Sequence, residues 1–266
     1  MPFACIGFAL AVSKEEYDFS IRLFILMLLC MVFARSAAMA FNRYIDVRFD
    51  KLNPRTAVRE IPSGIIKPSN ALFFVVITSV LFIITTAFIN RLCLYLSPIA
   101  LFVILFYSYT KRFTPLCHLV LGLGLSLAPI GAYLAVTGIF DWLPLMFSLL
   151  VFTWVSGFDI LYALQDEDFD KTHALNSIPV LLGRKGAMLS SRLLHFCSAI
   201  ILISIGFFFL TSFLYALGAF VFIGLLIYQH SLIKVNDISK IDLAFATTNG
   251  VASLVFGVIV ILSLII

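Results

Sequence analysis

Charged residues are scarce in this chain of 266 residues. Asp, Glu, Lys and Arg together make up 12% of it, whereas ordinary soluble domains carry roughly 25%. Hydrophobic residues make up 62%, and the mean hydropathy is +1.10. This composition excludes an ordinary soluble protein. Because apolar stretches of about 20 residues recur along the whole length, it indicates an all-α membrane protein.

Metal-binding and disulfide patterns are also lacking. The five cysteines are dispersed and show no C-x-x-C spacing, so neither a zinc site nor a disulfide framework is indicated. The four histidines form no H-x-x-x-H or E-x-x-H pattern. The net charge is +4, but the basic residues fall in short loops between apolar stretches, and nucleic-acid binding is therefore not indicated.

The apolar stretches predict about nine transmembrane helices in a single domain, residues 1–266. They lie at residues 1–12, 21–41, 71–89, 94–109, 115–137, 143–163, 187–209, 211–229 and 243–265. A helix of about 12 residues reaches only about 18 Å, which is short of the roughly 30 Å hydrocarbon core. We therefore expect that the first helix is truncated at its N-terminus and that the true start lies upstream.

The polar loops divide unequally between the two sides of the membrane. Alternating spans place residues 42–70 and 164–186 on the same side, together with most lysines and arginines. The other side receives Lys14, Arg22 and Arg91. By the positive-inside rule the first side is cytoplasmic. We expect an integral protein of the bacterial inner membrane whose active site faces the cytoplasm.

Two acidic motifs end long apolar stretches on this side. The first has the pattern N-x-x-x-D-x-x-x-D and the second D-x-x-Y-x-x-x-D-x-x-x-D. Their members are Asn42, Asp46 and Asp50, then Asp159, Tyr162, Asp166 and Asp170. On a helix, each set lies along one face. Carboxylates near hydrocarbon are costly and mark function by default, and two facing oxygen clusters suit Mg²⁺ with phosphate. The alternative is two solvated loops with incidental acids.

Basic residues follow the same loops and could bind phosphate. The candidates are Arg48, Arg55, Arg59, Lys111 and Arg112. Each one alone could equally be an anchor of the positive-inside type. As a group beside opposed carboxylates, they favour a site for a cation and a diphosphate.

Arg35 lies inside an apolar stretch, seven residues before Asn42. On a helix it shares a face with Asn42 and lies about 10 Å deeper. A cation at that depth is costly unless it is paired. It could form an internal ion pair or snorkel to the surface, or it could clamp the carboxylate of an acceptor, which a guanidinium binds in a bidentate fork.

Over nearly the whole chain these residues resemble the UbiA superfamily of intramembrane aromatic prenyltransferases. The resemblance is carried by both acidic motifs and by residues 34–43, 55–56, 59, 61–64, 107, 111–112 and 165. It implies nine transmembrane helices around a central cavity, with a cytoplasmic cap over the active site. The stretch from Asn53 to Thr56 looks more like the 4-hydroxybenzoate and menaquinone-precursor branches than haem farnesylation.

The resemblance also implies roles for individual residues. Two Mg²⁺ ions would be held on the diphosphate by Asn42, Asp46, Asp166 and Asp170, with support from Asp50 and Asp159. Arg59 and Lys111 would contact phosphate, Arg35 would meet the acceptor, and Tyr162 would stabilise the developing cation through its ring face.

The expected reaction transfers a polyprenyl group from polyprenyl diphosphate to an aromatic acid in quinone biosynthesis. The acceptor could be 4-hydroxybenzoate, of the ubiquinone route, or a dihydroxynaphthoate, of the menaquinone route. Prenyl chain length and oligomeric state are left open, and the tail is expected in membrane lipid. The alternative is a transporter of an anionic isoprenoid or lipid phosphate, but the inverted repeats typical of transporters are not seen.

Overall fold

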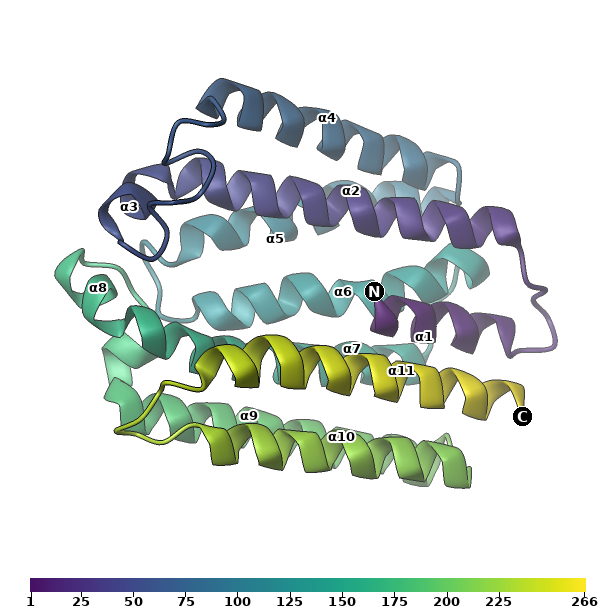
Figure 1. The fold of residues 1–266 in the computed structure, drawn as a ribbon. Coiled ribbons are helices and arrows are strands. Elements are labelled where there is room, and N and C mark those ends of the chain that lie inside the picture. Colours follow the sequence, from purple (N-terminus) through teal and green to yellow (C-terminus); the bar gives the residue numbers. More distant parts are fainter.

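The structure is a computed structural model of the chain, which describes residues 1–244 and 248–266 in full and only the backbone of residues 245–247. The described residues form helices and no named strand. The helices are α1 (Pro2–Val12), α2 (Ile21–Ile45), α3 (Val47–Leu52), α4 (Pro68–Ala87), α5 (Arg91–Thr110), α6 (Cys117–Thr137), α7 (Trp142–Tyr162), η1 (Ala163–Asp166), α8 (Glu167–Thr172), α9 (Ile178–Phe208), α10 (Phe213–Leu232), η2 (Leu243–Thr248) and α11 (Asn249–Ile265). The long helices lie side by side in one bundle (Figure 1).

Seven of these helices, in the described part of the chain, are long and apolar enough to cross a membrane. They are α2, α4, α5, α6, α7, α9 and α10, and each coincides with one of the expected spans. The other two expected spans coincide with the shorter apolar helices α1 and α11. The chain is therefore an integral membrane protein, as its composition predicted.

Close helix packing holds the middle of the bundle together. Helix α6 packs on α7, α7 packs on α9, and α1 packs on α6. A Cβ added at Gly7 of α1 would collide with the carbonyl of Pro129 of α6, and one added at Gly122 of α6 would collide with Ser156 of α7. Small residues therefore set the distance between these helix backbones, as is common where helices meet in a membrane.

Aromatic rings fill the core between the N-terminal helix and the C-terminal half of the chain. Phe3 of α1 lies 5.3 Å from the ring of Trp154 of α7 and 6.0 Å from that of Phe256 of α11. Phe222 of α10 contacts both partners, at 5.4 and 5.1 Å. Such ring pairs stabilise the fold beyond the effect of their buried area, and they join Phe3 of α1 to rings of three helices that lie more than 150 residues further along the chain.

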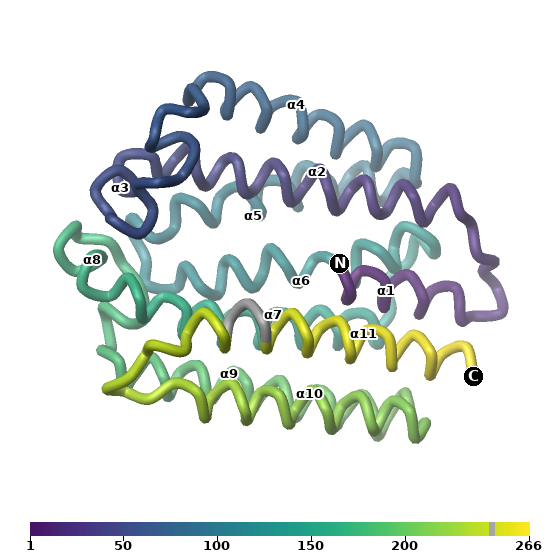
Figure 2. Tube along the Cα trace, in the orientation of Figure 1, coloured from purple at the N-terminus to yellow at the C-terminus, as the bar shows by residue number. Residues whose placement is uncertain are grey.

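The short helices gather at one end of the bundle. Figure 1 shows α3 and α8 beyond the same ends of the long helices, and Figure 2 traces the loops that follow them at that end. We expected each acidic motif to run along one continuous helix, and this is wrong. The backbone turns at Asp46 (φ −89°, ψ 4°) between α2 and α3, and α7 tightens into the 3₁₀ helix η1 before α8 begins.

Helix α9 also begins earlier than its apolar pattern predicted. The side chain of Ser177 accepts a hydrogen bond from the backbone N–H of Val180 and caps the helix, and Pro179 occupies its first turn. Gly183 interrupts it with φ 67° and ψ 176°, a conformation that glycine adopts readily. The first turn thus lies beside α8, at the same end as the acidic motifs.

Candidate active site

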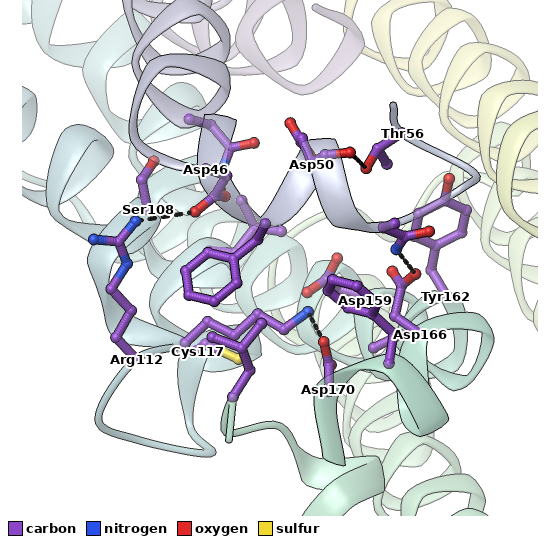
Figure 3. Close-up of a pocket in the computed structure, with 18 of the residues that line it drawn as sticks. Asp46, Asp50, Thr56, Ser108, Arg112, Cys117, Asp159, Tyr162, Asp166 and Asp170 are labelled. Atoms are coloured by element: carbon purple, nitrogen blue, oxygen red, sulfur yellow. Dashed lines mark hydrogen bonds and ion pairs between the residues drawn. The ribbon is translucent and has the colours of Figure 1, made fainter. Parts of the chain in front are cut away.

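A pocket of about 290 Å³ opens at the end of the bundle where the short helices gather. Its walls come from the α2–α3 turn and the loop that follows, the end of α5, the start of α6, and the run from α7 to α8 (Figure 3). Of the residues singled out in the sequence, it is lined by Asn42, Asp46, Asp50, Arg55, Arg59, Lys111, Arg112, Asp159, Tyr162, Asp166 and Asp170. The two motifs therefore meet in one pocket despite the breaks in their helices.

The acids of the first motif are held by two arginines. Arg59 Nη1 lies 2.9 Å from Asp50 Oδ1 and 3.0 Å from its Oδ2. Arg112 Nη2 lies 3.4 Å from Asp46 Oδ1 and also donates to the carbonyl of Ile45 at 2.8 Å. Asn42 donates from Nδ2 to Asp46 Oδ2 at 3.0 Å. Asp46 is thus positioned by groups from α2 and from the end of α5.

The acids of the second motif are held in the same way. Arg55 Nη2 lies 2.6 Å from Asp166 Oδ2 and 2.9 Å from its Oδ1, and Arg55 Nη1 donates to the hydroxyl of Tyr162 at 3.3 Å. Lys111 Nζ lies 2.7 Å from Asp170 Oδ1. Arg55 and Lys111 belong to segments far from the second motif in sequence, so these pairs join the two halves of the pocket.

The fifth acid has a different partner. Asp159 Oδ2 lies 2.7 Å from Nδ1 of His118, which is the second residue of α6. The sequence patterns missed His118, together with Asn53, which donates to Asp166 at 3.3 Å. These contacts span 41 and 113 residues. No spacing along the chain reveals such pairs, and only the resemblance pointed to another lining residue, Tyr107.

Burial changes the charge balance of the pocket. It raises the pKa of Asp46 to about 6, with a further contribution from neighbouring Asp50, although Arg112 and Lys111 act in the opposite direction. For Lys111, burial lowers the pKa, but the pairing with Asp170 outweighs it and leaves the pKa above its ordinary value. Lys111 is therefore a permanent cation, whereas Asp46 releases its proton near pH 6.

The pocket holds the types of ligand that a hard cation prefers, but within the described residues the carboxylates do not converge on one point. The pocket offers carboxylate and amide oxygens from both motifs, and Mg²⁺ prefers such ligands. In the described residues, however, no three His, Cys, Asp or Glu side chains converge closely enough to hold a metal ion. The basic partners hold the carboxylates apart, so a cation that enters must exchange places with them.

Two of the basic candidates lie elsewhere. Arg48 of α3 is exposed and does not line the pocket. Arg35 of α2 is exposed as well and is absent from the pocket lining. Its expected contact with an acceptor stays a prediction.

A buried glutamate, Glu167, lies within the second motif and pairs with two basic side chains. Glu167 follows Asp166 directly and is 5% exposed. It accepts from Lys171 Nζ at 2.5 Å and from Arg184 Nε at 2.8 Å. Arg184 follows the Gly183 break in α9, so this ion pair fastens α8 to α9. Because Asp170 belongs to α8 and Asp166 directly precedes it, this ion pair also holds both acids at the pocket.

Known proteins resemble this chain in both sequence and fold. The chain is 32% identical over 235 residues to a 4-hydroxybenzoate octaprenyltransferase of Aliivibrio fischeri (strain MJ11), which covers 87% of this chain and 80% of the relative. A second protein of that name, from Tolumonas auensis, is 30% identical over 226 residues, or 84% of this chain and 78% of the relative.

Solved structures agree with these matches. The apo structure of a UbiA homolog from Aeropyrum pernix K1 is 31% identical and superimposes with a TM-score of 0.88, covering 98% of this chain and 95% of the other. A UbiA homolog from Archaeoglobus fulgidus bound to DMAPP and Mg²⁺ has the same fold at 19% identity, with a TM-score of 0.71 over 99% and 96% of the two chains. The model of the UbiA prenyltransferase family matches residues 1–258, and the chain therefore belongs to this family of enzymes and is a prenyltransferase.

Proposed function

We propose that this enzyme transfers a polyprenyl group from polyprenyl diphosphate to an aromatic acid, in a reaction that depends on Mg²⁺. The observation that carries the proposal is the pocket of five carboxylates, four basic side chains and one histidine at the end of a membrane bundle. So many charged side chains would not stabilise a bound neutral lipid. A diphosphate, in contrast, can pair with the basic side chains while its cations pair with the carboxylates.

Donor binding would replace the existing ion pairs. Asn42, Asp46, Asp166 and Asp170 would hold the cations, and the bases that now pair with these acids would be released toward phosphate oxygens. Lys111 and Arg112 directly follow α5, while Arg55 and Arg59 lie four residues apart in the loop after α3. The bases therefore reach the pocket from two sides. Asp50 and Asp159 lie beside these groups and would support them.

Mg²⁺ would neutralise the diphosphate and stabilise the charge that grows on it as the C–O bond to the prenyl group breaks. The basic side chains of the chain would stabilise the same charge, since they are already in place and need little reorganisation. The ring of Tyr162 faces the pocket, where Arg55 now lies 5.7 Å from its centre. The same ring face would lie against the allylic cation once Arg55 has turned to the phosphate.

The aromatic acceptor would then attack the allylic carbon. Its carboxylate needs a cationic partner on the membrane side of the diphosphate, and Arg35, two turns before Asn42 on α2, is the candidate. The two named relatives are 4-hydroxybenzoate octaprenyltransferases, which favours 4-hydroxybenzoate. A dihydroxynaphthoate carries the same carboxylate and is the second candidate. We expect Arg35→Ala to raise the KM of the acceptor more than that of the donor.

The proposal includes the place of each substrate relative to the membrane. The prenyl tail would lie in or beside membrane lipid, and the pocket would face the cytoplasm, where a water-soluble aromatic acid and Mg²⁺ are available. A transporter of anionic isoprenoid or lipid phosphate is not favoured, because membership of the prenyltransferase family accounts for the basic residues without it.

The experiment that tests the proposal is an assay of the purified full-length chain with a polyprenyl diphosphate, Mg²⁺ and either 4-hydroxybenzoate or 1,4-dihydroxy-6-naphthoate. Mass spectrometry of the products would show a prenylated acid and name the acceptor. Release of diphosphate without alkylation of the ring would support the donor site and exclude both acceptors. Absence of any turnover by folded, Mg²⁺-loaded protein would overturn the proposal.

A further inference from the structure

One pair of side chains in the pocket is unlike the other four. His118 and Asp159 meet at 2.7 Å, and both line the pocket, but the imidazole is 4% exposed while the carboxylate is 22% exposed. The histidine is therefore enclosed behind the carboxylate, which faces the space that a substrate would fill. Figure 3 shows Asp159 among the side chains that line this space.

The hydrogen bonds around His118 define its tautomer. The backbone N–H of Ile178, at the start of α9, points at Nε2 at 3.4 Å. Because this group is a donor, Nε2 acts as the acceptor in this contact, and Nδ1 carries the proton that points at Asp159. Nδ1–H then donates to Asp159 Oδ2. The histidine is thus arranged to hold an ionised Asp159 in place, a role that a hydrogen-bonded partner often has for a reactive group.

The second oxygen of Asp159 is available. Oδ1 has no hydrogen-bond partner within the described residues, whereas the acids of the other four pairs are each bound by a lysine or an arginine. Asp159 also lies on α7 itself, one turn before its end at Tyr162, whereas Asp166 and Asp170 follow that end. It is therefore on the membrane side of the groups expected to hold the diphosphate, where the reacting carbon of the prenyl group must lie.

We propose that Asp159, held by His118, is the base that takes the proton from the acceptor ring, with Asp159 as the catalytic residue and His118 as its positioning residue. This inference rests on the proposed function. As the C–O bond to the diphosphate breaks, the ring forms a C–C bond to the allylic carbon and becomes positively charged. The ring carbon then loses its proton to Asp159 Oδ1, the C–H electron pair restores the aromatic ring, and bulk water later removes the proton from the carboxyl group.

The other acids of the pocket are less suited to this step. Asp46, Asp50, Asp166 and Asp170 each have an oxygen paired with a lysine or an arginine, and three of these four acids are expected to hold the cations. Asp159 keeps Oδ1 without a hydrogen-bond partner within the described residues, so this oxygen can meet the proton of the ring carbon. General bases placed in this way accelerate proton transfer by roughly 10² to 10⁴.

Three variants separate this role from a structural one. Asp159→Asn keeps the size of the side chain but cannot take up a proton. His118→Asn keeps an N–H donor near the position of Nδ1 and loses the acceptor for Ile178. His118→Gln does the reverse, because its amide oxygen reaches the position of Nε2 and its donor toward Asp159 is lost. Thermal unfolding of each purified full-length variant shows whether it is folded.

The assay uses a polyprenyl diphosphate, Mg²⁺ and 4-hydroxybenzoate with either hydrogen or deuterium at the attacked ring carbons. In Asp159→Asn we expect kcat to fall by on the order of 10² to 10⁴, the donor KM to stay near that of the wild type, and an isotope effect to appear as proton loss becomes slow. His118→Gln should show a smaller loss with the same isotope effect, and His118→Asn should recover much of the rate.

Each outcome decides the inference separately from the proposed function. An unchanged isotope effect in Asp159→Asn, or a donor KM that rises with the loss of kcat, would overturn the role as base. A greater loss in His118→Asn than in His118→Gln would show that His118 acts through Ile178 and not through Asp159. If the wild type itself prenylates neither ring, the proposed function has failed, and the wild-type reaction in the same assay reveals this first.

Discussion

At the scale of single residues, the carboxylates that are expected to bind cations differ from their neighbours in burial and partners. Asp166 is held by Arg55, and Asp46 by Arg112, whereas the nearby Asp168 has a side chain that is 88% exposed. We expect Asp46→Asn and Asp166→Asn each to lower Mg²⁺-dependent turnover by at least about 100-fold, because a bound metal contributes several kcal/mol to the transition state.

The matched control is Asp168→Asn, which removes the same charge from the same segment outside the pocket. It should prenylate at the wild-type rate. Rates are measured at saturating donor and over a series of Mg²⁺ concentrations. Near-normal turnover in either pocket variant would show that the assignment of cation ligands is wrong, and an equal loss in Asp168→Asn would show that the effect is one of net charge.

Burial of Asp46 leads to a pH dependence. Its pKa is raised to about 6 in the metal-free protein, with burial as the main cause. A raised pKa means that the proton is favoured below about pH 6, and the proton competes there with the cation. The stabilisation by Mg²⁺ should be present above pH 6 and be lost as the pH falls, with the half-saturating Mg²⁺ concentration rising about tenfold per unit of pH below 6. A half-saturating concentration that is constant between pH 5 and 7 would contradict this.

The sequence predicted most of the residues that line the pocket but not the partners that they contact. The spacing of the motifs identified the acids, and both sets do line one pocket. His118 was set aside because it belongs to no local pattern, yet it contacts Asp159 across 41 residues. Pairing between distant segments depends on how helices α6 and α7 pack, and a single sequence carries no direct record of that packing.

At the scale of elements, the contact between α6 and α7 determines whether His118 meets Asp159. Gly122 lies one turn after His118, and a Cβ there would collide with Ser156 and lie 2.7 Å from the backbone carbonyl of Phe152. The backbone cannot move aside cheaply, so Gly122→Ala must push the helices apart. Overpacking of this kind costs about 1–3 kcal/mol, and we expect a lower Tm together with slower prenylation.

Gly131 of the same helix is the control, because a Cβ there meets no atom within 4 Å. Gly131→Ala should leave both the Tm and the rate near those of the wild type, since it also raises helix propensity. The Tm is followed by the fluorescence of the detergent-solubilised protein during heating. A Tm of Gly122→Ala that equals that of Gly131→Ala would show that α6 and α7 are less tightly packed than the structure has them.

Apolar periodicity predicted where the long helices run but not where the active-site end departs from them. It had no means to detect the turn at Asp46 or the 3₁₀ segment from Ala163 to Asp166, because the residue spacing is nearly the same in both kinds of helix. It also placed the start of α9 late, since residues 178–186 are helical through capping by Ser177 and through packing on α8.

At the scale of the whole molecule, the two ends of the bundle differ. Helices α3 and α8 lie at one end of the bundle (Figure 1), and the pocket and the ion pairs of both motifs are at this end. The opposite end has short connections, held by an ion pair of 2.5 Å between Lys14 and Asp141, and this pairing lowers the pKa of Asp141. The proposed active site therefore lies at one end of the bundle, and the orientation of the protein would decide which compartment supplies its substrates.

That orientation is open to direct measurement. Ser239, in the loop after α10, and Glu15, in the loop after α1, are exposed at opposite ends of the chain's long helices. Each is replaced by cysteine in a variant whose five native cysteines are alanine. By the positive-inside rule the loop with Ser239 is cytoplasmic. A membrane-impermeant thiol reagent should then label Ser239→Cys in inverted vesicles and Glu15→Cys in intact spheroplasts. The reverse labelling would place the pocket outside the cytoplasm and remove its supply of Mg²⁺ and diphosphate donor from that side, so the proposed route of the substrates would have to be abandoned.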